Sequence, residues 1–170
     1  MAQPLCDAFL TKLHEQLKLT GHLIELLPKD ALDWAPAIAG AWSAGQLLGH
    51  ILECLSGFCA LLYTCEPERL AHFQLLREAP VNHRCGQEEA LERIRTYGNH
   101  IDQGFALLRD ADLARRIPTI FVSEGETIAT LLLGNLEHLI NHKHQLFMYL
   151  KLIGVAAGTR DLYRFRHEPA

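Results

Sequence analysis

The chain has 170 residues, of which 49% are hydrophobic and 21% are charged; this composition excludes global disorder and suits one globular domain spanning residues 1–170. The formal net charge is −4 at pH 7 and the Lys and Arg residues are scattered, which argues against a nucleic-acid-binding protein because such modules carry a basic stripe. No run of apolar residues approaches the ~18 that a transmembrane helix needs, so we expect no membrane contact either.

The first half of the chain predicts two long helices, because apolar residues recur there at intervals of three and four. The first helix is expected over about residues 4–27, where LPKD ends it, and a loop rich in Ala, Gly and Pro follows. The second helix is expected over about residues 43–64. It opens with Ser43 and Gln46, the S-x-x-Q pattern in which each side chain satisfies a backbone N–H at a helix start.

The second half begins with an irregular stretch over about residues 65–86, which can hold one short helix around ERLAHFQLL. A third helix is expected over about residues 87–109. The segment RRIPTIFVSEGETI then breaks the helical period, with an extended piece near residues 117–122 and a turn at Gly125.

The fourth helix is expected to begin near Thr127 and to end at Gly154, which suits a C-cap. Four amphipathic helices joined by modest loops predict an all-α fold, a four-helix bundle. The single extended piece is too short to predict a sheet. The last segment, TRDLYRFRHEPA, is expected to be a ragged end or a segment that docks on a partner.

Helix four is also unusually rich in leucine, more than one seam of a bundle needs. Exposed apolar patches often mark interfaces, and two-fold dimers are the commonest oligomers, so we expect a homodimer. The leucines behind this expectation are Leu132, Leu136, Leu139, Leu146 and Leu150.

The sequence has five cysteines, an odd number, and no C-x-x-C motif. A disulfide framework is therefore not expected, and reduced cysteines fit a cytoplasmic protein. The N-terminal stretch MAQPLCDAFL lacks the basic start and apolar run of a signal peptide, which agrees with that location.

Three histidines lie within seven residues of the apolar fourth helix: His138, His142 and His144. On a helical wheel of ~100° per residue, His144 falls on a charged strip and is expected to face solvent. His138 and His142 fall on a polar strip without charged residues, which fits a cavity or buried site better than a surface. Their neighbours on that strip are Thr127, Leu131, Asn135, Gln145 and Tyr149.

The i, i+4 spacing of His138 and His142 stacks the imidazoles with Cβ atoms ~5–6 Å apart, so both can reach one metal ion at ~2.0–2.1 Å. Taken alone, H-x-x-x-H is a weak signal, and a bundle site also needs a ligand from a facing helix. The second helix offers His50, for which the residues alone leave two readings open: a third ligand or a histidine on the shoulder of the helix.

Two further residues near His50 can each be interpreted as a metal ligand or in another role. Glu53 lies one turn after His50 and can be a ligand, although its position on the wheel favours a supporting or solvent-facing role. Cys54 can approach the same site or pack in the core as a small hydrophobe, and we expect core packing. Candidate acceptors for the second ring nitrogens of the histidines are Glu53, Asn135, Asn141 and Gln145.

Two longer motifs add a family resemblance. AWSAGQLLGHILE resembles the second helix, led by Trp-Ser, of the DinB-like four-helix metal-binding superfamily, and HLINHKHQLFMYLKLIG resembles the last-helix motif of the same family. LDWAPAIAGAW also looks like the loop that precedes helix two in that family. The resemblance covers roughly residues 10 to 155 and implies that the metal ligands are His50, His138 and His142.

The sequence departs from the family pattern around the last ligand, where it has Asn141, Lys143 and His144. The family often has a further histidine just before that ligand and Arg-Gly after it. The surroundings of the ligands are therefore expected to differ from those of relatives.

The expected cofactor is a divalent metal ion, Zn, Ni, Fe or Mn. The resemblance implies a metal-dependent enzyme of thiol-transferase or hydrolase type that acts on a small molecule, which can be a low-molecular-weight thiol. The alternative is a non-catalytic, stress-associated binding protein with a structural metal. An open three-histidine site argues for catalysis, since structural zinc sites usually have four protein ligands.

Overall fold

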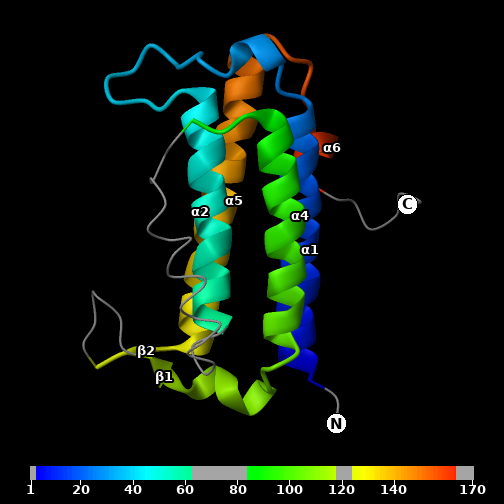
Figure 1. Ribbon diagram of the computed structural model, residues 1–170, viewed down its shortest axis with the longest axis vertical. Helices are drawn as coiled ribbons and strands as arrows, with labels where there is room; N and C mark the ends of the chain where they lie inside the picture. Colours follow the sequence, from blue (N-terminus) through cyan, green and yellow to red (C-terminus); the bar gives the residue numbers. More distant parts are fainter. Residues whose placement is uncertain (1–2, 63–83, 118–123, 164–170) are drawn as a thin grey trace.

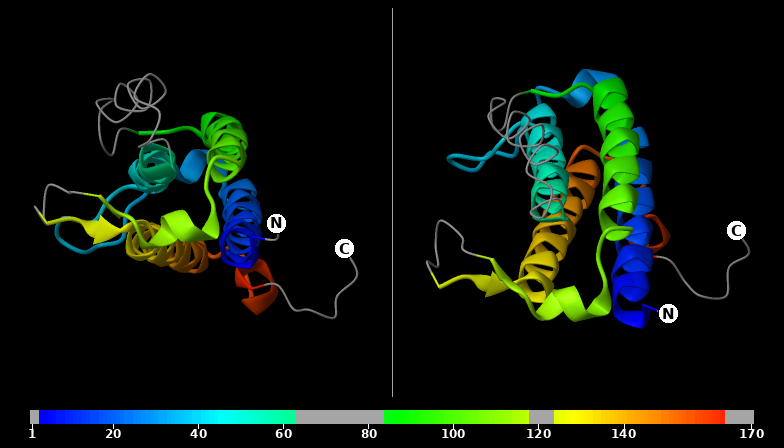
Figure 2. Two further views of the ribbon diagram at one scale, coloured as in Figure 1. Left: turned by 90° about the horizontal axis from the view of Figure 1, so that it is seen from below. Right: turned by 60° about the horizontal axis from the view of Figure 1, so that its bottom comes forward.

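Four long helices form the body of the molecule (Figure 1). The computed structural model describes residues 3–62, 84–117 and 124–163. The view along the bundle shows a ring in which α1 and α2 are each packed against α4 and α5 (Figure 2). The predicted all-α class and helix bundle are confirmed. The helices are α1 (Pro4–Glu25), α2 (Ala44–Leu62), α4 (Gln87–Phe105) and α5 (Ile128–Leu152).

The helices α2 and α4 are neighbours that run in the same direction, whereas α1 and α5 run the opposite way (Figure 1). The starts of α2 and α4 are joined where Cys85 N donates to Gly45 O at 3.0 Å. The antiparallel pair α2 and α5 packs against the antiparallel pair α1 and α4. Residues 63–83, which contain the predicted short helix near ERLAHFQLL, lie outside the described residues.

The local signals at three predicted boundaries are confirmed. The amide of Gln46 donates to Ser43 Oγ at 3.2 Å and the amide of Ser43 donates to Gln46 Oε1 at 2.9 Å, which is the reciprocal cap expected before α2. Gly125 and Gly154 have φ values of 81° and 84°, which glycine adopts without steric cost. Gly125 makes the turn before α5, and Gly154 follows the C-cap residue Ile153 at the end of that helix.

Helix α4 ends at Phe105, earlier than the predicted end at 109. The chain turns instead into a 3₁₀ helix, Asp110–Ala114, whose start is capped where Arg109 N donates to Asp112 Oδ2 at 2.9 Å. The carboxylate of Asp110 accepts the first amides of α1, from Leu5 at 3.1 Å and Cys6 at 3.0 Å. The short acidic run therefore has a capping role that helical periodicity does not reveal.

The structure contains a small antiparallel pair of strands, β1 (Arg116–Ile117) and β2 (Glu126–Thr127), which the sequence analysis did not predict. Most of the predicted extended piece, residues 118–122, lies outside the described residues. Beyond α5, a short helix, α6 (Thr159–Leu162), packs against α1. The C-terminal segment is thus helical in part.

The leucines of α5 belong to the core of the bundle. Leu132, Leu139, Leu146 and Leu150 are fully buried, and Leu136 packs against the same core. They do not supply the exposed surface from which a homodimer was predicted, so the homodimer stays a prediction without this support. None of the helices in the described part of the chain combines the length and hydropathy needed to cross a membrane.

Candidate metal centre

Three histidines converge between α2 and α5. His50 Nε2 on α2 lies 3.1 Å from His138 Nε2 and 3.0 Å from His142 Nε2 on α5. One nitrogen of each ring lies within 4.8 Å of the others, and the described residues contain no other group of this kind. His144, two residues after His142, is exposed on a different strip of α5, as the wheel predicts. The three predicted residues are therefore brought together by the fold.

The hydrogen bonds at the other ring nitrogens fix the orientation of two rings. His50 Nδ1 lies 3.1 Å from Glu53 Oε2, and His142 Nδ1 lies 3.0 Å from Gln145 Oε1. An ionised carboxylate and an amide oxygen only accept, so both Nδ1 atoms carry the proton. In a neutral imidazole the other nitrogen then has a free lone pair. The Nε2 atoms of His50 and His142 therefore point lone pairs into the cluster.

The surroundings keep the rings on α5 neutral. Burial is the largest cause that lowers the pKa of His138, and the neighbouring His50 adds to it while Glu53 opposes it. Burial also lowers the pKa of His142. The hydrogen bond that His142 donates to Gln145 opposes this shift, and the other two histidines add to it. Neutral imidazole is the form that binds a metal ion.

An aromatic wall covers one side of the cluster. The Trp42 ring lies 4.3 Å from the His50 ring and 5.7 Å from the His142 ring, measured between centroids. The cluster borders solvent at two residues, because His138 is exposed and the Glu53 side chain is 28% exposed. The sequence analysis assigned no role at the site to Trp42; the signal for it was its place in the Trp-Ser pair that precedes α2.

Of the two other candidate ligands near His50, Glu53 lies at the site and Cys54 lies in the core. Glu53 is bound to the ring of His50 and supports it. Cys54 is buried in the core, where its Sγ contacts the carbonyl of His50 at 3.5 Å. Burial raises the pKa of the Cys54 thiol to about 12, so the thiol is protonated at neutral pH. The prediction of core packing for this residue is confirmed.

Lys143 corrects one expectation from the sequence. It follows His142 directly and was placed among the residues around the ligands, but its side chain faces α1 and α6 instead. Its Nζ donates to Gln16 Oε1 at 2.7 Å and to Leu162 O at 3.0 Å, and the residue is only 2% exposed. Adjacent residues on a helix differ by ~100° in direction, which accounts for the separation.

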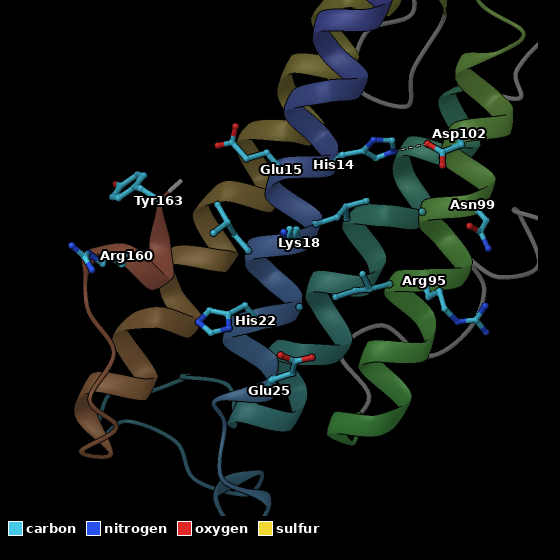
Figure 3. A pocket seen from close by; sticks show the side chains of 15 residues that line it. His14, Glu15, Lys18, His22, Glu25, Arg95, Asn99, Asp102, Arg160 and Tyr163 are labelled. Carbon is cyan, nitrogen blue, oxygen red and sulfur yellow. Dashed lines mark hydrogen bonds and ion pairs between the residues drawn. The ribbon is translucent and has the colours of Figure 1, made fainter. Parts of the chain in front are cut away.

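A second polar region surrounds α1, on the other side of the bundle (Figure 3). A groove of about 690 Å³ is lined by residues of α1, α4 and the α6 end of the chain. Two histidines of α1 bind carboxylates there: His14 Nε2 lies 2.5 Å from Asp102 Oδ1 and His22 Nε2 lies 2.7 Å from Asp161 Oδ1. None of the lining residues comes from the α2–α5 pair.

The donor set of the α2–α5 cluster fits a divalent metal ion. Nitrogen ligands at ~2.0–2.1 Å from a tetrahedral ion are about 3.3 Å apart, close to the 3.0 and 3.1 Å between the Nε2 atoms here. Imidazole nitrogens suit several first-row ions. A family model described as the DinB superfamily matches residues 12–146.

The chain belongs to the DinB superfamily. Among solved structures, this DinB-superfamily fold is similar to that of a DinB-like protein, YjoA, from Bacillus subtilis, with a TM-score of 0.68 and 21% sequence identity over 88% of this chain and 94% of that chain. At this identity the likeness shows the fold alone. None of the curated proteins matches the chain.

Proposed function

We propose that the chain binds one divalent metal ion through His50, His138 and His142 and uses it in an enzymatic reaction on a small molecule. The observation that carries the proposal is the convergence of three Nε2 atoms whose partner nitrogens, in His50 and His142, already donate elsewhere. Facing lone pairs repel unless a cation lies between them. The cluster therefore has the electronic form of a site that is completed by a positive ion.

A single proton would relieve this repulsion only in part. A proton on His50 Nε2 can be donated well to one neighbour, yet His138 and His142 both lie within 3.1 Å of that atom. A metal ion satisfies all three lone pairs at once. The lowered pKa values of His138 and His142 also disfavour the proton at neutral pH.

A bound divalent ion would supply a Lewis acid that lowers the pKa of a coordinated thiol or water. The residues of the chain prepare the site for this role. The three ligands are neutral and leave the charge of the ion uncompensated, while Glu53 holds the His50 ring by its Nδ1–H and increases its basicity. The exposed His138 gives a small molecule access.

Together with the superfamily resemblance, these features favour a thiol transferase or a hydrolase. The alternative is a stress-associated binding protein with a structural metal, and it requires a closed site. Structural zinc sites usually have four protein ligands, whereas this cluster offers three described ligands and an exposed His138. The open site supports the enzyme.

Metal binding is tested first, without reference to activity. Purified protein is titrated with Zn²⁺ and the bound metal is measured by elemental analysis. We expect one equivalent per chain in the wild type and in the His144→Ala control, and loss of binding in His142→Ala. Equal loss in His142→Ala and His144→Ala would contradict the assignment of the ligands.

Activity is tested second, with protein loaded with Zn²⁺, Ni²⁺, Mn²⁺ or Fe²⁺. Each form is assayed with pairs of a low-molecular-weight thiol and an electrophile and, separately, with hydrolysable esters and amides. We expect turnover with redox-inert Zn²⁺ that disappears in His138→Ala. Turnover that requires iron and consumes O₂ would overturn the Lewis-acid role, and metal binding without turnover in any pair would favour the structural alternative.

A further inference from the structure

A continuous chain of hydrogen bonds leads from the His142 ring to the loop before α2. His142 Nδ1 lies 3.0 Å from Gln145 Oε1, Gln145 Nε2 donates to Tyr149 Oη at 3.2 Å, and Tyr149 Oη donates to the Trp42 carbonyl at 3.0 Å. The three side chains come from one face of α5, at intervals of three and four residues. They connect the candidate metal centre to a segment of the chain about 100 residues away in sequence, as the separation of 107 positions between Trp42 and Tyr149 shows.

The donor and the acceptor are fixed in each of these three hydrogen bonds. The Trp42 carbonyl can only accept, so the Tyr149 hydroxyl donates to it and accepts from the Gln145 amide N–H. The Gln145 amide oxygen is then turned to His142 and can only accept from its Nδ1–H. The position of a backbone carbonyl in the loop thus determines which nitrogen of His142 carries the proton.

Tyr149 is held at this junction by packing as well. It is 4% exposed, and a buried hydroxyl needs partners because its desolvation is costly. Its ring meets the Trp34 ring edge-on, with centroids 5.3 Å apart. One tyrosine of α5 therefore contacts both tryptophans of the loop, Trp34 through its ring and Trp42 through its hydroxyl.

The loop itself is fixed mainly at its ends. Ala44 N donates to Trp34 O and Gly45 N donates to Leu32 O, both at 2.8 Å, which ties its base to the start of α2. Its middle is exposed, and Ile38 is 70% exposed. Trp42, at the end of the loop, carries both the carbonyl that ends the hydrogen-bond chain and the ring that covers His50 and His142.

We propose that Gln145 and Tyr149 are positioning residues that couple the loop of residues 33–42 to the ligand His142, so that metal binding and the placement of Trp42 stabilise each other. The proposal rests on the proposed metal centre. A metal ion that binds His142 Nε2 would withdraw electron density from the ring and make its Nδ1–H a stronger donor. Consecutive hydrogen bonds also strengthen one another. The coupling is reciprocal: a loop that is held in place favours binding by the same factor by which binding holds the loop.

The test compares Tyr149→Phe with Tyr97→Phe as a matched control. Tyr97 is also a largely buried tyrosine, but it lies on α4, and both variants lose only a hydroxyl. Zn²⁺ affinity is measured by titration, and hydrogen exchange is measured in a peptide covering residues 33–43 with and without Zn²⁺. We expect Zn²⁺ to slow exchange of this peptide in the wild type and in Tyr97→Phe. In Tyr149→Phe we expect most of the slowing to disappear and the affinity to fall about tenfold, the lower end of the effect of outer-shell substitutions.

Gln145→Glu separates the two ends of the chain of hydrogen bonds. Its carboxylate still accepts from His142 Nδ1–H but has no N–H to donate to Tyr149, whose hydroxyl then turns to the carboxylate and releases the Trp42 carbonyl. We expect Zn²⁺ to bind without slowing exchange in the loop. Gln145→Leu should lose both affinity and the protection of the loop.

The outcomes distinguish failure of the coupling from failure of the metal centre. A wild-type protein that binds Zn²⁺ while exchange in residues 33–43 is unchanged overturns the coupling alone, as does a Tyr149→Phe variant that behaves like the wild type in both measurements. A wild-type protein that binds no Zn²⁺, Ni²⁺, Mn²⁺ or Fe²⁺ overturns the metal centre, and the coupling with it.

Discussion

Histidines occupy two regions of this bundle in opposite ways. On the surface of α1, His14 binds the carboxylate of Asp102 on α4 (Figure 3). His22 binds the carboxylate of Asp161 on α6. In the cluster between α2 and α5 the rings instead turn their Nε2 atoms toward one another. The first arrangement is complete within the chain and the second is not. The presence of histidine is therefore less informative than the partners that its two nitrogens have.

The same contrast holds for two adjacent residues of α5. Lys143 is more deeply buried than its neighbour His142, yet its ammonium group has two acceptors of the chain within 3.0 Å. A buried polar group of this kind ties helices together. His142 keeps one nitrogen free for a ligand from outside the chain.

The largest expected effect is on stability in the presence of metal. At free Zn²⁺ about 1,000 times the dissociation constant, the free energy of unfolding should rise by up to about 4 kcal/mol, the value for an ion with no affinity for the unfolded chain. We expect this rise in the wild type and in His14→Ala, and none in His138→Ala. Thermal unfolding with and without Zn²⁺ measures it, and a rise in His138→Ala as large as in the wild type would erase the difference between the two regions.

Acid should release the metal. Each ring must be deprotonated to bind, and burial lowers the pKa of His138 and His142. The affinity should therefore be nearly constant above pH ~7 and should fall below the ordinary histidine pKa of about 6.5.

The stability of the metal-free protein should follow the same direction. As the pH falls below ~6.5, the unfolded chain takes up protons on these two histidines before the folded protein does. Their contribution to the free energy of unfolding is therefore lost as the pH falls through the lowered pKa values. Titration of Zn²⁺ between pH 5 and 8 checks the affinity, which should fall progressively toward pH 5. An affinity that rises on acidification would contradict neutral histidine ligands.

Gln16→Leu should sharpen the contrast between Lys143 and His142. It removes an acceptor from a buried ammonium group, and we expect a loss of about 2–3 kcal/mol in the free energy of unfolding. Thr20→Val, at another buried polar residue of α1, is the control and should cost less. Chemical denaturation measures both.

The loss of stability in Gln16→Leu should depend on pH in a direction that follows from the pKa of Lys143. Burial lowers the pKa of Lys143 to about 8, below the ~10.4 of an unfolded lysine. The folded protein thus releases this proton first, and the contribution of Lys143 to stability rises with pH above about 8. The deficit of Gln16→Leu should be largest below pH 8 and should shrink above it. A deficit independent of pH would assign the loss to packing alone.

Glu53→Gln tests the support of His50. The amide oxygen can still accept from Nδ1–H, but the charge that increases the basicity of the ring is lost, so we expect the Zn²⁺ affinity to fall about tenfold, or ~1.4 kcal/mol. Glu88→Gln, an exposed position on α4, removes the same charge from a helix that carries none of the three histidines and should leave the affinity unchanged. Isothermal titration compares the two.

The smallest effect is expected on the surface of α1. His14 and Asp102 are about half exposed, with side-chain exposures of 48% and 49%, and exposed ion pairs contribute little to stability. His14→Ala should change the free energy of unfolding by less than about 0.5 kcal/mol and should leave the metal content unchanged. A change in metal content would show that the two regions are not independent.

The sequence predicts those features that depend on local periodicity. The uncharged strip on α5 separates His138 and His142 from His144 without knowledge of any other helix, and the caps at Ser43 and Gly154 are local too. His50 required the family motif, because its own neighbours leave two readings open.

Other features could not be predicted because they depend on which helices become neighbours. The side chain of Lys143 finds its acceptors on α1 and near α6, and Asp110 caps a helix more than 100 residues away, from Leu5 at a separation of 105 positions. The carbonyl of Trp42 finds Tyr149 in the same long-range way. Periodicity gives the direction of a side chain on its own helix but not the partner that it meets.

The separation of the three histidines along the chain has a consequence for the synthesis and folding of the protein. His50 lies 88 positions from His138 and 92 from His142, and closing so long a loop is entropically costly and slow. A nascent chain that has only just passed α4 holds one ligand and no site. On the proposed function, metal capture would have to wait until α5 has been synthesised and has docked on α2, so that an ion at this centre would mark a finished bundle and connect its early and late parts.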